Sequence, residues 1–300
     1  MTKNTKIQWT DMTWPITTGC ERISPGCMNC YAIKDSWRLA HNPNPKVSEP
    51  YVNTVKKTII DNQSVLNWTG IVKCHLDRLD WVTPRQKPMM VFVCNMSDLF
   101  HKNVPFEFID RVWEQMAQCT QHTFQVLTKR PERMLEYFQS FPESRIFVNE
   151  QNSMEGEWPL TNVWLGTSTE NQVFADQRVP VLLEIKRLLK NKPIVYLSME
   201  PLCGKVRLKS EWLPHNHPSL DWIIAGGESH PSKSKARPCP IDLLRAIKEQ
   251  CEETEVPFFL KQLGSRPVVG SQYLSLKDPK GGDMEEWSED LRVRQFPVFL

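Results

Sequence analysis

The sequence predicts an α/β fold in which parallel strands build a partial or full TIM-like (β/α) barrel with helices on the outside. Three observations predict it: short apolar segments recur along the chain, amphipathic segments of helical length separate them, and polar residues follow each apolar segment. Alternation of this kind is typical of parallel sheets with right-handed crossovers.

Six segments are short, apolar and rich in β-branched residues, as buried strands are. They are residues 91–94, 124–127, 163–165, 194–197, 222–225 and 258–260. Helices are expected at 105–120, 175–190 and 241–254, where apolar residues recur at intervals of three and four. Pro105 and Pro240 stand where a first helical turn tolerates proline.

Polar and ionisable side chains follow every predicted strand. Ligands bind at the carboxyl ends of parallel strands, so these side chains are expected to share one site. They include Asn95, Ser97, Asp98, Thr128, Lys129, Arg130, Ser168, Glu170, Ser198, Glu200, Glu228 and Lys261.

The length of 300 residues suits one barrel domain, which we expect to span 1–267, followed by a covering segment at 268–300. Residues 40–69, rich in Pro and Asn, are expected to form an irregular insertion. We find no motif of a hydrolase, such as a nucleophile elbow or a P-loop.

Composition limits the partners and the compartment. The net charge of +2 supplies no general attraction to polyanions, so a nucleic-acid contact would need a local basic patch. Lys233, Lys235 and Arg237 could form one, although a solvated loop is the simpler interpretation. No apolar run suits a membrane span or a signal peptide. Nine cysteines, three of them close together and six scattered, suit a reducing compartment better than a disulfide framework, so we expect a cytoplasmic protein.

The strongest chemical signal is a C-x6-C-x2-C segment formed by Cys20, Cys27 and Cys30. Thiolates at this density usually hold a metal or a cluster. Three ligands favour a 4Fe-4S cluster with one open iron, because structural zinc sites usually have four protein ligands. Zinc stays an alternative, with Cys74, His75 or Cys94 as the fourth ligand.

Over almost its whole length the chain resembles the phage-associated three-Cys-motif family, described as a domain of unknown function. The segments that carry the resemblance are IQWTDMTWPITTGCERISPGCMNCYA, MSDLFHKNVPFEFI, FQVLTKRPERM, NVWLGTSTENQ, LSMEPLCG, DWIIAGGES, PFFLKQLG and EDLRVRQFP. More distantly it is similar to radical SAM enzymes of the spore photoproduct lyase type. Their common spacing is C-x3-C-x2-C, from which this chain departs.

This distant resemblance implies that the three cysteines hold a 4Fe-4S cluster whose open iron binds S-adenosylmethionine. It places cofactor contacts at the strand ends, and the candidates are Asn95, Ser97, Asp98, Thr128, Ser168, Glu170 and Ser198. The candidate catalytic residues are Lys129, Arg130, Glu200, Glu228 and Lys261. The cations among them would bind anionic substrate groups or, alternatively, pair with Glu170, Glu200 and Glu228.

The expected substrate is a nucleic-acid base or nucleotide that is modified or repaired. Trp9, Trp14 and Trp164 are candidate surface rings for stacking on a base. Two rival interpretations remain: a metal-braced nucleic-acid-binding protein without catalysis, and a subunit that acts only with a partner protein encoded nearby. The sequence does not indicate the electron donor.

Overall fold

The computed structural model describes residues 5–60, 62–140, 160–189 and 192–298. The chain divides into two compact units, Met1–Val163 (the first unit) and Trp164–Leu300 (the second unit).

The first unit contains three adjacent parallel strands. Their order is β1 (Met12–Trp14), β6 (Met90–Val93) and β7 (Thr123–Thr128). Met12 pairs with Val91, which in turn pairs with Phe124. The predicted strands at 91–94 and 124–127 are confirmed. The sequence analysis missed β1, because three residues are too few to show an apolar run.

A helix follows each of the two longer strands. α3 (Phe106–Gln118) follows β6, and α4 (Pro131–Gln139) follows β7. The regularly spaced apolar side chains of α3 are buried, which confirms the predicted helix at 105–120. Trp113 of α3 packs against Phe138 of α4 with ring centroids 5.9 Å apart, so the two helices share a core.

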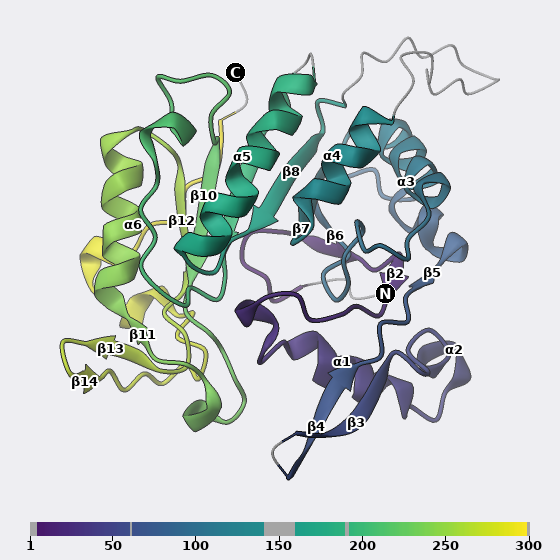
Figure 1. The fold of residues 1–300 in the computed structure, drawn as a ribbon, viewed down its shortest axis with the longest axis horizontal. Helices are drawn as coiled ribbons and strands as arrows, with labels where there is room; N and C mark the ends of the chain where they lie inside the picture. Colours follow the sequence, from purple (N-terminus) through teal and green to yellow (C-terminus); the bar gives the residue numbers. More distant parts are fainter. Residues whose placement is uncertain (1–4, 61, 141–159, 190–191, 299–300) are drawn as a thin grey trace. The chain divides into compact units, whose positions relative to one another are not determined.

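The prediction of an irregular insertion at 40–69 is wrong. This segment contains the short helix α2 (Pro45–Ser48) and a hairpin of β3 (Val55–Ile60) and β4 (Gln63–Trp68). The hairpin lies beside α1 (Tyr31–Ala40), as Figure 1 shows. Only one face of this two-stranded ribbon packs against the apolar core around α1. The residues between those positions face away from this core and are often polar, so the segment does not read as a continuous apolar strand.

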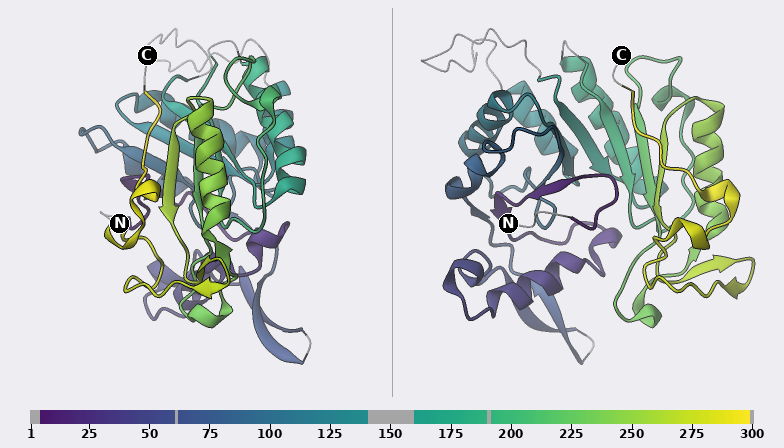
Figure 2. Two further views of the ribbon diagram at one scale, coloured as in Figure 1. Left: turned by 90° about the vertical axis from the view of Figure 1, so that its left-hand side faces the viewer. Right: turned by 180° about the vertical axis from the view of Figure 1, so that it is seen from behind.

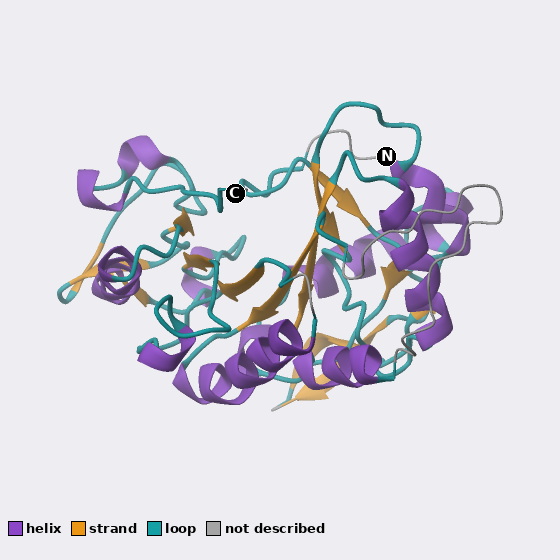
Figure 3. Ribbon diagram, turned by 90° about the horizontal axis from the view of Figure 1, so that it is seen from above, coloured by secondary structure: helices purple, strands orange, loops and turns teal. Residues whose placement is uncertain are grey.

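The second unit contains four adjacent parallel strands. Their order is β8 (Val163–Ser168), β9 (Val195–Met199), β10 (Trp222–Gly226) and β12 (Phe258–Gln262). α5 (Gln172–Leu188) packs against β9, and α6 (Ile241–Glu253) packs against β10 and β12. These helices lie on one side of the strands in Figure 3. The four predicted strands and both predicted helices of this unit are confirmed.

Parallel strands followed by helices in both units confirm the predicted α/β class. Seven strands take part, three in the first unit and four in the second. Closure into a full barrel stays a prediction, as does the single domain at 1–267. No described helix has both the length and the apolar character needed to cross a bilayer.

The three tryptophans that were expected at the surface are buried instead. Trp9, Trp14 and Trp164 are 2%, 0% and 1% exposed. Trp14 donates from Nε1 to the carbonyl oxygen of Arg78 over 2.7 Å, and Trp164 packs edge-on against Trp222. The prediction that these rings stack on a base is therefore wrong, because large rings in or beside covered strands fill the core.

The C-terminal part of the second unit folds back along β12. Leu260 N donates to Val293 O, and Gln295 N donates to Phe258 O, both over 2.9 Å. Figure 2 shows this segment, in yellow, running beside β12. The remaining strands are β2 (Thr17–Thr18) and β5 (Lys73–Cys74), which pair with each other, and β11 (Cys239–Pro240), β13 (Pro267–Val269) and β14 (Gln272–Tyr273), which form a small sheet.

Candidate metal centre and strand-end site

The three-cysteine loop lies between β2 and α1 in the first unit. Its start depends on Gly19, whose φ of +87° and close approach to Ile71 exclude a side chain: a Cβ would lie 2.0 Å from the Ile71 carbonyl oxygen. Cys27 ends a short 3₁₀ turn, Pro25–Cys27, and Cys30 is the residue at the N-cap of α1. Cys27 and Cys30 therefore stand at the two ends of the short connection between the 3₁₀ turn and α1.

Cys30 interacts electrostatically with both other thiols of the loop, Cys20 and Cys27. Burial raises the pKa of Cys20 to about 12, and negative charge on Asp98 and Cys30 adds to this rise. Burial also raises the pKa of Cys30, with a contribution from Cys27, while backbone N–H groups of Ala32 and Ile33 oppose it. These effects link Cys20 to Cys30 and Cys30 to Cys27, and the first turn of α1 supplies backbone donors to Cys30.

Asp98 joins the ends of two neighbouring strands beneath this loop. Its Oδ1 accepts hydrogen bonds from Phe100 N (3.0 Å) and Thr128 Oγ1 (2.7 Å). Its Oδ2 accepts from Lys129 N (3.1 Å) and Arg130 Nη1 (2.8 Å). The carboxylate thus accepts from the last residue of β7 and from the two residues that follow it, so three residues predicted as separate site groups act together: Asp98, Thr128 and Arg130.

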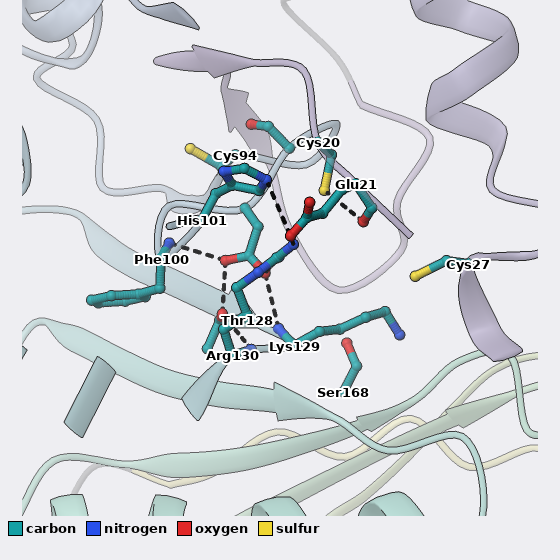
Figure 4. A network of polar contacts seen from close by, with 12 residues as sticks. Cys20, Glu21, Cys27, Cys94, Phe100, His101, Thr128, Lys129, Arg130 and Ser168 are labelled. Atoms are coloured by element: carbon teal, nitrogen blue, oxygen red, sulfur yellow. Dashed lines mark hydrogen bonds and ion pairs between the residues drawn. The ribbon is translucent and has the colours of Figure 1, made fainter. Parts of the chain in front are cut away.

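Arg130 extends from this carboxylate toward the cysteine loop, where Figure 4 shows it beside Glu21 and Cys20. Its Nη2 lies 3.5 Å from Glu21 Oε1. Burial alone would lower the pKa of Arg130, but Asp98 and Cys20 raise it above its ordinary value. The guanidinium in turn lowers the pKa of the Cys20 thiol, against the larger effect of burial. Arg130 therefore stabilises negative charge on Cys20.

Glu21 and His101 complete this network, and the sequence analysis missed both. Lys102 Nζ lies 3.1 Å from Glu21 Oε2, and His101 Nε2 lies 3.8 Å from Glu21 Oε1. Burial and the neighbouring Arg130 lower the pKa of His101 to about 4, so the ring is neutral at pH 7. Its Nδ1 accepts from Asn103 N over 3.1 Å, which leaves the proton on Nε2, facing Glu21. The position of Glu21 next to Cys20 was the one available signal.

Ser97 and Asn95 belong to the turn that follows β6. The Ser97 hydroxyl lies 2.6 Å from Thr17 Oγ1 and donates to Thr17 O over 2.9 Å, so it anchors the turn to β2. The Asn95 carbonyl oxygen accepts from Tyr31 Oη over 2.6 Å, which ties the turn to α1 just after Cys30. These two predicted cofactor residues thus brace the cysteine loop from below.

The candidates for a fourth zinc ligand are engaged with β2. Cys94 Sγ lies 3.1 Å from Thr17 Oγ1, and His75 Nε2 lies 2.9 Å from Thr18 Oγ1. Cys74 itself pairs with Thr17 through the backbone. Ligation by Cys94 or His75 would break its threonine contact, whereas the cysteines of the loop make no such bond to β2 in the described hydrogen bonds.

The predicted residues of the second unit form a second set at their own strand ends. Ser168 of β8 pairs in register with Ser198 of β9. Lys261 Nζ lies 3.0 Å from Glu200 Oε1, so this cation pairs with a carboxylate, as the alternative interpretation allowed. Gly226 makes room for the pair, because a Cβ there would lie 2.9 Å from Glu200 Oε1.

Two further predicted carboxylates pair with arginines that the sequence analysis did not place in this role. Arg178 Nη1 lies 3.2 Å from Glu170 Oε2 and donates to Ser168 O over 2.7 Å. Glu228 accepts from the backbone N–H of Arg237 over 2.8 Å and also from its guanidinium. Both arginines follow their carboxylates closely in sequence, which is a weak signal by itself.

The donor chemistry of the first unit fits a thiolate-bound metal or cluster. Cys30 lies at the N-cap of α1, and the Arg130 cation lies close enough to Cys20 to lower the pKa of its thiol. Lys129 also lowers the pKa of Cys30, after the larger effects of burial and backbone donors. Positive groups around a thiolate cluster offset its negative charge.

The fold and the site together define a parallel α/β protein with a three-cysteine loop above its strand ends. Residues 4–288 match a family described as "Protein of unknown function (DUF5131)", so the chain belongs to that family. No curated protein matches the chain, and no solved structure does.

Proposed function

We propose that this protein is an iron–sulfur enzyme of the radical SAM class that acts on a nucleic-acid base or nucleotide. One observation carries the proposal: Cys20, Cys27 and Cys30 belong to one loop that follows the first parallel strand, with Cys30 at the N-cap of a helix. A loop of three thiolates is the ligand set that leaves one iron of a 4Fe-4S cluster open.

In this proposal Cys20, Cys27 and Cys30 hold the cluster. The bound cluster and S-adenosylmethionine would supply one-electron chemistry that releases 5′-deoxyadenosine and removes a hydrogen atom from the substrate. Arg130 stabilises the Cys20 thiolate, and backbone donors of α1 stabilise that of Cys30. Asp98 and Thr128 position Arg130 through their hydrogen bonds to each other and to Arg130.

The strand ends of the second unit carry polar groups suited to a polar ligand. Ser168 and Ser198 offer hydroxyl groups side by side, and the Glu200–Lys261 pair can reorganise around a polar ligand. The nucleic-acid substrate and a phage-related role come from the family resemblance. All nine cysteines are free thiols, which supports a reducing, cytoplasmic location as part of the proposal.

The test is anaerobic reconstitution with iron and sulfide, reduction with dithionite and addition of S-adenosylmethionine, with 5′-deoxyadenosine quantified by mass spectrometry. The triple variant Cys20→Ala/Cys27→Ala/Cys30→Ala is the control. Cysteine-dependent 5′-deoxyadenosine supports the proposal. Stoichiometric zinc in place of iron would overturn it, and so would a fully loaded cluster that gives no product either alone or with the partner protein.

A further inference from the structure

The second unit contains a cavity beside the small sheet of β11, β13 and β14. Its volume is about 260 Å³. Two cations, one aromatic ring, a serine, a leucine and a carboxylate stand out among its lining residues: Lys233, Arg266, Tyr273, Ser265, Leu276 and Asp278. The lining therefore combines positive charge with an apolar and aromatic wall.

Both cations are held in place by backbone carbonyl groups. Lys233 Nζ donates to Leu276 O over 3.2 Å, which uses one of the three donors of the ammonium group. Arg266 Nη1 donates to Ser234 O (3.3 Å) and Ala236 O (3.2 Å). These hydrogen bonds fix the positions of the two side chains. Because the acceptors are neutral carbonyl oxygens, the bonds do not neutralise the two positive charges.

Tyr273 supplies a ring next to these charges. The Arg266 guanidinium carbon lies 4.6 Å from the centroid of the ring, and Arg266 Nη2 donates to the tyrosine hydroxyl. The residue is nevertheless 58% exposed. A ring fixed by an arginine and open to solvent is a platform on which a nucleobase can stack.

The charge around the cavity favours an anion. Lys235, Lys277 and Lys280 are exposed residues of the segments that line it or follow it. The nearby carboxylates accept backbone hydrogen bonds: Asp278 accepts from Lys280 N (3.0 Å), and Glu286 accepts from Lys277 N (2.6 Å). These bonds offset the negative charge of the two carboxylates, so the lysines and Arg266 form a local basic patch. Because the net charge of the whole chain is only +2, binding of a polyanion depends on such a patch.

We propose that this cavity binds a phosphate ester of a nucleotide, with Lys233 and Arg266 at the phosphate and Tyr273 against the base. Lysine and arginine are the usual phosphate partners, and aromatic stacking accepts any base. The inference goes beyond the proposed radical chemistry, because it concerns binding by the second unit and needs no cofactor. The phosphate ester can belong to a free nucleotide or to a single strand.

The experiment measures binding of the full-length protein by fluorescence anisotropy at several salt concentrations. The probes are a labelled single-stranded DNA of about 12 nucleotides, the same strand with abasic sites, and a labelled adenosine monophosphate. The variants are Lys233→Gln and Tyr273→Leu, both at exposed residues, with Lys205→Gln as an exposed control of the same charge change.

Lys233→Gln should weaken DNA binding roughly tenfold at about 0.1 M salt and reduce the slope of log affinity against log salt by about 1. Tyr273→Leu should weaken binding of the normal strand at least about fivefold and leave the abasic strand unaffected. Lys205→Gln should match the wild type.

Binding of adenosine monophosphate with the same variant effects would support the free nucleotide as the source of the phosphate. The proposal is overturned if the wild type binds neither the single-stranded DNA nor adenosine monophosphate, or if Lys233→Gln and Tyr273→Leu bind as tightly as Lys205→Gln. Because the triple cysteine variant should retain binding, this result is independent of whether 5′-deoxyadenosine forms.

Discussion

Arg130 and Asp98 form a buried ion pair that links the ends of two parallel strands to the cysteine loop. The contact between Nη1 and Oδ2 is 2.8 Å, and the two side chains are 11% and 7% exposed. The same guanidinium lies 3.5 Å from Glu21, which directly follows Cys20 in the sequence. The pair therefore connects the segments after β6 and β7 to the residue next to Cys20, the first predicted metal ligand.

Removing the carboxylate charge should therefore destabilise the first unit. We expect Asp98→Asn to lower the free energy of unfolding by about 3 kcal/mol, because it leaves the Arg130 charge with only the longer, 3.5 Å contact to Glu21. Urea unfolding measures the change. Asp35→Asn is the matched control: its pair with Arg38 spans 3.4 Å, both side chains are well exposed, and the expected loss is below about 0.5 kcal/mol. Equal losses in the two variants would contradict a special role for the buried pair.

The metal content should depend on the loop cysteines and not on the cysteines of the neighbouring strands. We expect Cys27→Ala to lose most of its iron after anaerobic reconstitution, because a three-ligand site has no spare thiolate. Iron and zinc are quantified by elemental analysis.

Cys74→Ala and Cys94→Ala serve as controls for this loss. Cys94 is 3% exposed and contacts Thr17, so its removal should cost some stability and leave the iron content unchanged. If either control abolishes metal binding as fully as Cys27→Ala, the site has four protein ligands and the zinc alternative gains support.

The strands, the main helices and the polar strand ends could be predicted because each depends on a local pattern. Ser168 and Ser198 end successive apolar strands, and parallel pairing places them side by side. Choosing the partner of each charge needs the three-dimensional arrangement. Glu200 has Lys261 as its partner, but Glu170 has Arg178, which lies on the helix that follows rather than at another strand end.

The tryptophans and the hairpin show why other predictions failed. The number of tryptophans suggested stacking surfaces, yet Trp14 lies in β1, a strand too short to recognise from sequence, and is completely buried. The hairpin around Val55 and Trp68 buries one face against α1, a helix whose position the sequence does not show. Burial of a ring or a ribbon face depends on what packs over it.

Stability should fall in mild acid because of buried neutral histidines. The pKa of His101 is about 4, below the ordinary 6.5, mainly through burial, and that of His75 is shifted in the same way. Below pH 6.5 the unfolded chain takes up protons that the folded chain does not bind. The free energy of unfolding should therefore decrease as the pH falls from about 6.5 to about 4.

Urea unfolding at a series of pH values measures this decrease. His101→Gln should flatten the pH dependence, since the amide oxygen can still accept from Asn103 N but cannot titrate. An unchanged dependence in His101→Gln would show that His101 is not a source of the acid sensitivity.

Gly19 should be required for the cysteine loop to form. It has a φ of +87°, and a Cβ would lie 2.0 Å from the carbonyl oxygen of Ile71. Gly19→Ala must therefore shift the backbone just before Cys20, and we expect it to lower the free energy of unfolding by more than about 1 kcal/mol. It should also reduce iron incorporation, because Cys20 moves relative to Cys27 and Cys30. Gly204→Ala is the control, since its nearest neighbour would be 3.7 Å away and its φ is ordinary. Normal iron content in Gly19→Ala would mean that the loop holds its ligands without the backbone geometry that this glycine permits.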